Sequence, residues 1–284
     1  MSESGWRRHQ KWRKMKKKEI TGTEALLRSN ERWCMNACNR YINRNAEKDN
    51  VWLHKNGSGN ILALIVQSKQ SLLPVLDDQE IPPPYFLRGL FGAVPVHSLQ
   101  GRKEDVLITE AAMEKTGLYA AEKIDYDLMC IDQPPSGFHT ACPGLVIRKP
   151  QYADMNALAA LQAAYEQEEV LPSASEFSAA VSRLNIEKIF SKEQMLVAEL
   201  GGRLIGKINT NAVTFTRYQV GGVYVLPEYR GRGIARRMAG EFIASLTAQG
   251  RGISLFVKKS NPAARRVYQR IGFEILGDYR INYY

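Results

Sequence analysis

A strand, a glycine-rich turn and a long helix follow one another between residues 218 and 249. The expected strand, 218–225, is rich in aromatic and β-branched residues, and the expected helix, 233–249, is amphipathic. Between them runs YRGRGIARRM, residues 229–238, with two glycines and four arginines. Glycines at this density let the backbone bend sharply or approach a ligand, and arginines favour an anion. The turn therefore predicts a phosphate site at the N-terminus of a helix.

Two common phosphate-binding turns do not match this stretch. A P-loop needs Gly-Lys followed by Ser or Thr, which does not occur here. A dinucleotide-binding turn needs a third glycine, but Arg236 stands at that position when counted from Gly231. The strand and helix also come late in their half of the chain. We therefore expect a phosphate or pyrophosphate cradle of another kind.

The composition describes a folded chain of two domains. Its 284 residues are 44% hydrophobic and 24% charged, with a net charge of +10. The longest apolar run, 61–66, is too short to span a bilayer, and the N-terminus lacks a secretory pattern. We expect a cytoplasmic protein without a membrane partner. Four cysteines, with neither a C-x-x-C pair nor nearby histidines, predict no metal site and no disulfide framework.

The positive charge is concentrated at the N-terminus. Residues 1–20 hold eight Lys or Arg against Glu3 and Glu19, a net of +6, which leaves +4 for the remaining chain. Such an arm can bind phosphate backbones, but charge runs are more often solvated terminal segments. Binding of nucleic acid through residues 1–20 therefore stays an alternative. Nothing in the sequence indicates an oligomeric state.

The stretch DQPPSGFHTACPG, residues 132–144, is rich in Pro, Gly and small polar residues, and predicts a linker. We therefore divide the chain into a basic segment at 1–20, an α/β domain at 21–131, a linker at 132–143 and a second domain at 144–284.

The expected elements alternate between helices and strands. The first domain should contain a helical region at 23–41, strands at 51–54, 61–67, 72–75 and 94–97, a break at Pro82–Pro84, a helix at 105–115 and a strand at 124–131. The second should contain strands at 145–148, 195–200, 203–208, 218–225, 253–257 and 273–284, and helices at 153–167, 174–190, 233–249 and 261–270. Gly201-Gly202 predicts a hairpin. This order indicates an α/β (α+β) fold, with a mixed sheet flanked by helices.

The second half resembles the GNAT acyltransferase superfamily. The acetyl-CoA turn of that superfamily has Arg or Gln, two residues, Gly, one residue, then Gly or Ala, and Arg230, Gly233 and Ala235 fit it. SNPAARRVYQRIGF, residues 260–273, resembles the helix that follows, and order and spacing agree over 145–284. The resemblance implies an N-acetyltransferase that uses acetyl-CoA as co-substrate. A primary amine of an unidentified acceptor would attack the thioester directly, without a metal or a covalent enzyme intermediate.

The resemblance also implies which residues form the site. Asn261 and Pro262 form an N-cap and first-turn pair, and Asn261 and Tyr268 share one helix face. Tyr268 is implied as the general acid that protonates the departing CoA thiolate. The residues implied to bind acetyl-CoA are Val223, Tyr224, Val225, Arg230, Gly231, Arg232, Gly233, Ile234, Ala235 and Asn261.

A base for the amine is not carried over by the resemblance. Many members of the superfamily hold a carboxylate on the strand before the turn, but 218–225 contains no Asp or Glu. Glu166, Glu168 and Glu169 in EQEEV are candidates on the substrate side, although such a run is also typical of a solvated helix face. A water chain or an already neutral amine are the alternatives.

The first half carries no such turn. LQGRKED, residues 99–105, lies between an expected strand and helix, but its single glycine would make a poor cradle. Because this half also ends with a helix and a strand, we expect a degenerate GNAT-like domain, and an unrelated α+β domain fits equally well. His54, His97 and His139 are isolated, and we interpret them as structural or exposed. The alternative functions are transfer from another acyl-CoA, a non-catalytic CoA-binding regulator, and a nucleic-acid-associated protein.

Overall fold

The computed structural model of the chain divides into two compact units. Unit 1 comprises residues 1–126 and 277–284, and unit 2 comprises residues 127–276. The structure describes residues 12–44, 49–76, 81–93, 95–140, 142–171 and 176–284. It differs from the predicted second domain at the end of the chain, because residues 277–284 belong to unit 1.

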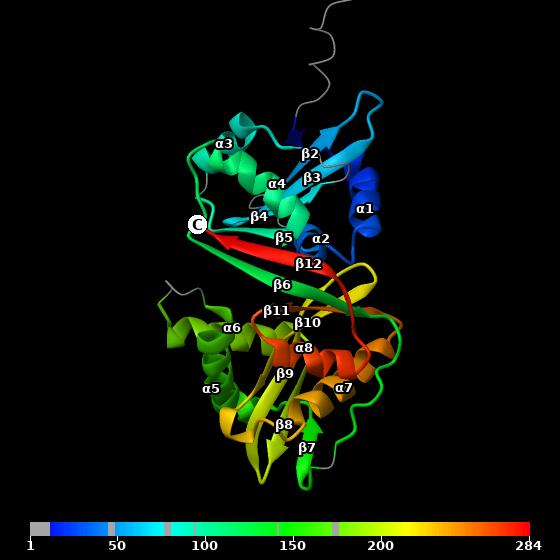
Figure 1. The fold of residues 1–284 in the computed structure, drawn as a ribbon, viewed down its shortest axis with the longest axis vertical. Coiled ribbons are helices and arrows are strands. Elements are labelled where there is room, and N and C mark those ends of the chain that lie inside the picture. The colour runs from blue at the N-terminus through cyan, green and yellow to red at the C-terminus, as the bar shows by residue number, and fades with distance from the viewer. Residues whose placement is uncertain (1–11, 45–48, 77–80, 94, 141, 172–175) are drawn as a thin grey trace, which may run out of the picture. The chain divides into compact units, whose positions relative to one another are not determined.

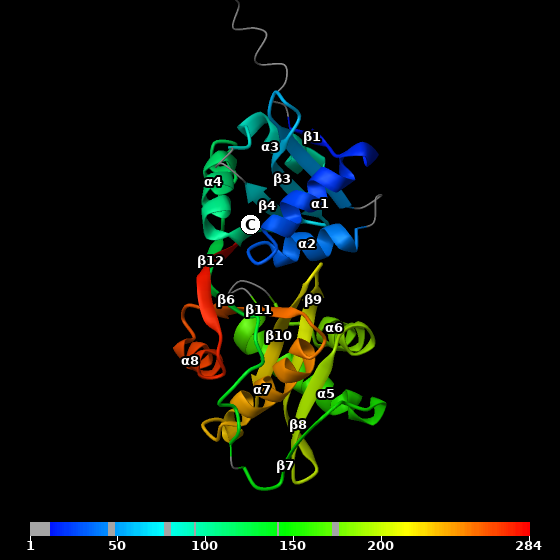
Figure 2. The ribbon, with the colours of Figure 1, turned by 90° about the vertical axis from the view of Figure 1, so that its right-hand side faces the viewer.

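Unit 1 is a sheet with helices on both faces. Its strands lie in the order β1-β2-β3-β4-β5-β12, antiparallel from β1 to β4 and parallel between β4 and β5. Figures 1 and 2 show α1 and α2 on one face and α3 and α4 on the other. The elements are β1 (Arg13–Lys14), η2 (Lys17–Glu19), α1 (Ile20–Ser29), α2 (Met35–Ile42), β2 (Asp49–Lys55), β3 (Ile61–Ser68), β4 (Ser71–Leu76), α3 (Pro84–Ala93), β5 (Ser98–Arg102), α4 (Lys103–Glu114), and parts of β6 (Glu122–Ile131) and β12 (Glu274–Tyr283).

Alternation along the strands of unit 1 divides its side chains between the two faces. On β3, Ala63 and Ile65 pack in one core with Leu87 of α3 and Val106 of α4. Trp12 closes this core and stacks on Phe86 at 5.2 Å between ring centroids. Ala63 and Ile65 are two positions apart and face the same side of the sheet, because successive side chains of a strand point to opposite faces.

The structure refines one expectation for unit 1 and contradicts two. The helical region expected at 23–41 is helical but consists of two helices, because the Asn30 side chain donates to Leu26 O and ends the first one. Of the strand expected at 94–97, residue 94 lies outside the described residues and 95–97 are not a strand, since Pro95 has no N–H for a ladder; the strand begins at Ser98 as β5. The break expected at Pro82–Pro84 is in part a helix start, because Pro84 begins α3, where a missing N–H costs no bond.

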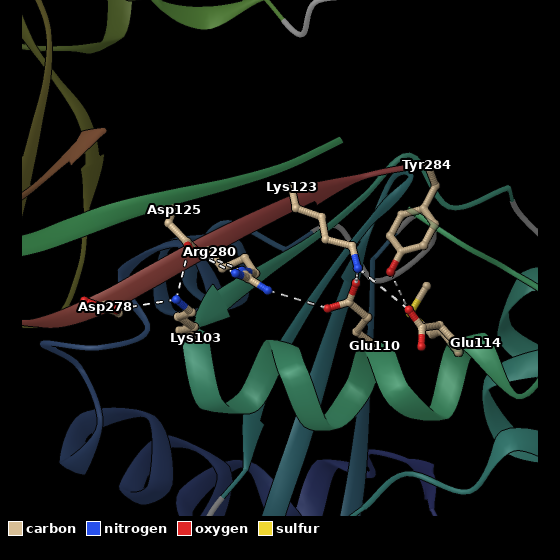
Figure 3. A network of polar contacts seen from close by, with 9 residues as sticks. Lys103, Glu110, Glu114, Lys123, Asp125, Asp278, Arg280 and Tyr284 are labelled. Carbon is tan, nitrogen blue, oxygen red and sulfur yellow. Dashed lines mark hydrogen bonds and ion pairs between the residues drawn. The ribbon is translucent and has the colours of Figure 1, made fainter. Parts of the chain in front are cut away.

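The last strand fastens the C-terminus to unit 1. Residues 279–283 of β12 pair antiparallel with β5. Arg280 Nε and Nη2 donate to the Asp125 carboxylate at 2.7 and 3.0 Å, and Arg280 Nη1 lies 3.9 Å from Glu110, as Figure 3 shows. Lys103 also contacts Asp125, at 2.9 Å. Charges from β6, α4 and β12 thus form one network.

Unit 2 has the same layered design. Its strand order is β6-β11-β10-β9-β8-β7. Gly201 and Gly202, both at positive φ, join β8 and β9 in the predicted hairpin. The elements are β7 (Leu145–Arg148), η3 (Tyr152–Asp154), α5 (Met155–Tyr165), η4 (Glu166–Val170), α6 (Ala179–Lys192), β8 (Met195–Leu200), β9 (Arg203–Val213), β10 (Arg217–Val225), η5 (Pro227–Tyr229), α7 (Ile234–Thr247), β11 (Gly252–Lys258) and α8 (Pro262–Arg270).

Two separate cores cover the faces of this sheet. Met195, Val197 and Leu204 pack with α5 and α6, whereas their neighbours Ala198 and Ile205 pack with α7. Figure 1 shows α5 and α6 on the face opposite α7. Neighbouring residues of one strand therefore stabilise different helices.

The parallel strands β10 and β11 pair only where they begin. Residues 217–219 are in register with 252–254, and the remaining part of β10, 220–225, has no partner on β11. On its other edge β10 stays paired with β9, with a register shift between Gly221 and Tyr224. The C-terminal ends of β10 and β11 are therefore not paired with each other. The chain turns into α7 after β10 and into α8 after β11.

The stretch expected to be a linker is part of unit 2. Phe138 packs against the α7 core, and a Cβ on Gly240 of α7 would lie 2.1 Å from Phe138 Cγ. Ser136 N donates to Ile271 O at 3.2 Å. The connection from β6 to β7 thus follows α7 (Figures 1 and 2). Among the described residues, no helix is both long and apolar enough to cross a bilayer.

Candidate functional site

A cavity of about 860 Å³ in unit 2 lies among the end of β10, the turn before α7, one face of α8 and the η4 segment. We call it the β10–α7–α8 cavity. Its walls are formed by His139, Thr140, Glu168, Glu169, Val223, Tyr224, Val225, Tyr229, Arg230, Gly231, Arg232, Gly233, Ile234, Ala235, Arg236, Asn261, Ala263, Ala264, Val267, Tyr268 and Arg270. Every residue expected to bind acetyl-CoA is in this wall, and so is Tyr268.

The glycine turn has the backbone that its sequence predicts. Gly231 and Gly233 have φ of +79° and +75°, which other residues adopt only with strain. A Cβ on Gly231 would meet nothing within 4 Å, so the backbone there faces open space. Gly233 is the N-cap of α7, whose first N–H groups have no partner within the helix. These donors and the positive end of the helix dipole point to an anion.

The wall holds four arginines, and the three at the glycine turn and the start of α7 have different partners. Arg230 donates from Nε to Val225 O at 2.9 Å and from both Nη atoms to Glu168 at 2.7 Å. Arg232 is exposed and donates to Glu228 O at 3.3 Å. Arg236 Nε is buried and has no hydrogen-bond partner among the described residues. Of these three, Arg236 has the donor best suited to a ligand.

Helix α8 begins with a residue that has two partners. Asn261 Oδ1 accepts a hydrogen bond from Ala264 N at 3.0 Å, which caps the helix, and Asn261 Nδ2 donates to Glu169 Oε1 at 3.1 Å. Two turns later, Tyr268 is buried beside Phe273, with ring centroids 5.7 Å apart. Burial raises the pKa of the Tyr268 hydroxyl well above its usual value. Tyr268 therefore holds its proton throughout the neutral range.

The three glutamates of EQEEV have different surroundings. The five residues of this segment form η4, a single π-helical turn, and such turns often occur at functional sites. Glu166 is buried outside the cavity wall and accepts hydrogen bonds from Gln162 and Asn185 at 2.8 and 3.0 Å. Glu168 binds Arg230, and these hydrogen bonds lower its pKa. Glu169 lines the cavity, and burial raises its pKa.

A buried lysine behind the cavity was not predicted. Lys207 of β9 has no exposed surface, and its Nζ donates to Gly222 O at 2.9 Å and to Asn209 Oδ1 at 3.2 Å. The same atom lies 4.6 Å from the centre of the Tyr165 ring. Burial lowers the pKa of Lys207 to about 7. A lone lysine within the apolar run RLIGKI was the available signal.

Sequence reasoning also missed part of the wall. Ala264 and Val267 lie close to Tyr268 on the helix, so helical spacing from Asn261 could have indicated them. His139 and Thr140 come from the expected linker, where no periodic pattern exists. His139 is exposed, as expected, but it also lines the cavity.

Comparison with known proteins defines the class. Residues 158–273 match the Acetyltransferase (GNAT) family. The N-alpha-acetyltransferase RimI of Mycobacterium tuberculosis is 36% identical over 83 residues, which is 28% of this chain and 51% of RimI. The similar region thus spans about half the length of that relative. The site and these matches define an acyltransferase domain. Residues 158–273 therefore carry a domain of the GNAT family of acetyltransferases.

Two solved structures are similar in fold over nearly the whole chain. A Drosophila protein has a TM-score of 0.62 at 14% identity, covering 97% of this chain and 99% of its own. A tandem GNAT protein from the clavulanic acid biosynthesis pathway has a TM-score of 0.56 at 12% identity, covering 95% and 97%. The predicted fold class is confirmed. Within the chain, β4-α3-β5-α4-β6 of unit 1 repeats the order β10-α7-β11-α8-β12.

Proposed function

We propose that this chain is an N-acetyltransferase that transfers an acetyl group from acetyl-CoA to a primary amine in the β10–α7–α8 cavity. The observation that supports this most strongly is that one cavity joins the glycine turn, the free end of β10 and Tyr268. These parts lie up to 45 residues apart in the sequence, between Val223 and Tyr268. A thioester donor and an amine acceptor require such a meeting of distant groups.

Acetyl-CoA fits the donors of this cavity. The open backbone at Gly231, the N-terminus of α7 and the buried Arg236 Nε all donate hydrogen bonds, so they suit the pyrophosphate. Val223–Val225, which β11 leaves unpaired, suit the amides of the pantetheine arm. Acetyl-CoA supplies an activated thioester when it binds.

Tyr268 and Glu169 are the groups that we assign to proton transfer. The Tyr268 hydroxyl holds a proton that can pass to the departing thiolate. Glu169 lines the cavity, and within the described part of the chain its carboxylate has no ion pair, so it is suited to receive a proton from the acceptor ammonium. Glu168 is instead held by Arg230. Because RimI is named an N-alpha-acetyltransferase, the first acceptors to test are peptides with a free α-amino group.

We assign transfer to unit 2 alone. In the element order, the connection between β4 and α3 of unit 1 corresponds to the connection between β10 and α7 that holds the glycine turn of unit 2, and its residues 77–80 lie outside the described part. Its sequence, DDQEIPP, holds three acidic residues and two prolines. Carboxylates repel phosphate, and prolines lack the N–H groups that a cradle needs. No observation favours the nucleic-acid alternative: residues 1–11 lie outside the described part, and Arg13 pairs with Glu19.

The test is calorimetric titration of acetyl-CoA into the full chain and two matched variants. Gly231→Glu places a carboxylate where we expect the pyrophosphate, and Gly250→Glu is its control beyond the other end of α7. Both glycines have φ near +75° and open space around the Cβ position, so the backbone strain is equal. We expect affinity lost only in Gly231→Glu. Equal affinity in all three proteins, or none in the wild type, would contradict the proposal. Amine acceptors are then screened by release of free CoA thiol.

A further inference from the structure

The segment 136–140, which the sequence predicts to be a linker, ends beside the glycine turn. A Cβ on Gly233 would lie 2.8 Å from Thr140 Cγ2, so the Thr140 side chain packs directly on the N-cap of α7. His139 and Thr140 both line the cavity. The segment is held against α7 and the end of α8, so the contact between Thr140 and Gly233 belongs to a fixed part of the fold.

Two anchors hold this segment in place. The Phe138 ring packs against α7 at Gly240, where no larger residue would fit. Ser136 N donates to Ile271 O, just after α8. Between the anchors and Thr140, His139 stacks on Phe138 with ring centroids 4.4 Å apart. The segment is thus a built wall of the cavity.

The Thr140 hydroxyl lacks a partner within the described part of the chain. Thr140 Oγ1 is buried and makes no hydrogen bond there. A buried hydroxyl without a partner is costly and calls for an explanation. The groups around the same end of the cavity, the first N–H groups of α7 and Arg236 Nε, are donors. A ligand portion that satisfies all of them must be rich in acceptors, as a phosphate is.

We propose that Thr140 is a phosphate-binding residue of the acyl-CoA site, donating its hydroxyl to the pyrophosphate, and that the 136–140 segment forms the outer wall of the phosphate cradle. This rests on the proposed function. Thr140 adds to the pyrophosphate site a contact that comes from outside the glycine turn. Thr140 recognises the nucleotide end of the donor and makes no contact with the thioester.

The experiment compares two ligands on the full chain. CoA contains the pyrophosphate, whereas S-acetylpantetheine carries the thioester and the amide arm without any phosphate. The dissociation constant of CoA is measured by calorimetry, and that of S-acetylpantetheine by its displacement of CoA. The variants are Thr140→Val, which keeps the shape and removes the hydroxyl, and Thr140→Ser, which keeps the hydroxyl.

We expect Thr140→Val to weaken CoA roughly tenfold, as for a lost hydrogen bond to a charged group, with S-acetylpantetheine unchanged and Thr140→Ser near wild type. Unchanged CoA affinity in Thr140→Val would overturn the inference and leave the proposed function standing. An equal loss for both ligands would also overturn it, because it would indicate a structural role. Failure of the wild type to bind CoA would remove the proposed function as well.

Discussion

Glu168 and Glu169 are neighbours in the sequence but have opposite shifts in pKa. Hydrogen bonds from Arg230 lower the pKa of Glu168, and burial raises that of Glu169. The difference comes from the π turn η4, which directs one carboxylate to the exposed arginine and the other to the half-buried cavity wall. A carboxyl with a raised pKa is the better proton acceptor near neutral pH.

Glu169→Gln should therefore lower kcat by roughly 100-fold or more, the usual contribution of a positioned base. Glutamine still accepts the hydrogen bond from Asn261, so the dissociation constant of acetyl-CoA should change little. In the wild type, kcat should fall as acid protonates Glu169, and this acidic limb should disappear in the variant. Steady-state kinetics across pH measure both effects. The control is Glu168→Gln, and an equal loss of kcat in the two variants would contradict the assignment.

Lys207 makes stability depend on pH. Its pKa is about 7 in the folded chain against an ordinary value of 10.5. Between these values the unfolded chain binds more protons at this group, so its contribution to stability rises with pH, by at most about 1.4 kcal/mol per pH unit. Below pH 7 the lysine is charged in both states, and the full cost of burying the charge is present.

Lys207→Met should remove this rise. We expect the free energy of unfolding of the variant to change less than that of the wild type between pH 7 and 9. Urea unfolding at each pH gives the difference, and Lys192→Met, at an exposed lysine of α6, is the control. Identical pH profiles for wild type and Lys207→Met would show that the lysine is not buried as described.

At the scale of elements, prediction succeeded where the pattern is local. The turn and α8 were predicted because Gly231, Gly233, Asn261 and Pro262 carry their backbone signals in the sequence. The sequence signals that predict the turn from β10 into α7 lie within about 20 residues of one another.

Prediction failed where contacts with residues distant in the sequence determine the position of a side chain. Nothing near Thr140 indicates that Phe138 packs on Gly240, a hundred residues later. The buried position of Lys207 depends on Gly222 and Tyr165 from other elements. The glutamates could be named as candidates, but their separate roles depend on Arg230 and on the π turn. Tertiary contacts of this kind produce no periodic pattern in the sequence.

The start of α8 is an element whose cap also positions a candidate base. Asn261→Asp keeps an oxygen that can accept from Ala264 N, so α8 should remain formed. It replaces the amide that donates to Glu169 with a second carboxylate, which should raise the pKa of Glu169 further. The acidic limb of the kcat profile should then move to higher pH. Asn261→Ala, which loses the cap, should instead destabilise the chain by about 1 kcal/mol. A limb that stays in place in Asn261→Asp would refute the contact.

At the scale of the whole molecule, the chain ends in the unit in which it began. Sequence spacing placed residues 277–284 in the second domain, since β12 follows α8 directly. The structure assigns them to unit 1, where Tyr279 is fully buried and Arg280 holds Asp125. The pairing of β12 with β5 is non-local, so the pattern of one strand could not reveal it.

Removal of residues 277–284 should therefore weaken unit 1, although the deleted residues follow unit 2 in the sequence. The deletion exposes the edge of β5 and leaves the buried face of α4 without the Arg280–Glu110 and Lys103–Asp278 contacts (Figure 3). We expect amide hydrogen exchange to accelerate in β5 and α4, while β8 and β9 of unit 2 keep their protection. Arg280→Gln in the full chain, which removes the charge but keeps the strand, should give a smaller change in the same peptides. Faster exchange confined to unit 2 would mean that the last strand stabilises the domain it follows, as its position in the sequence suggests.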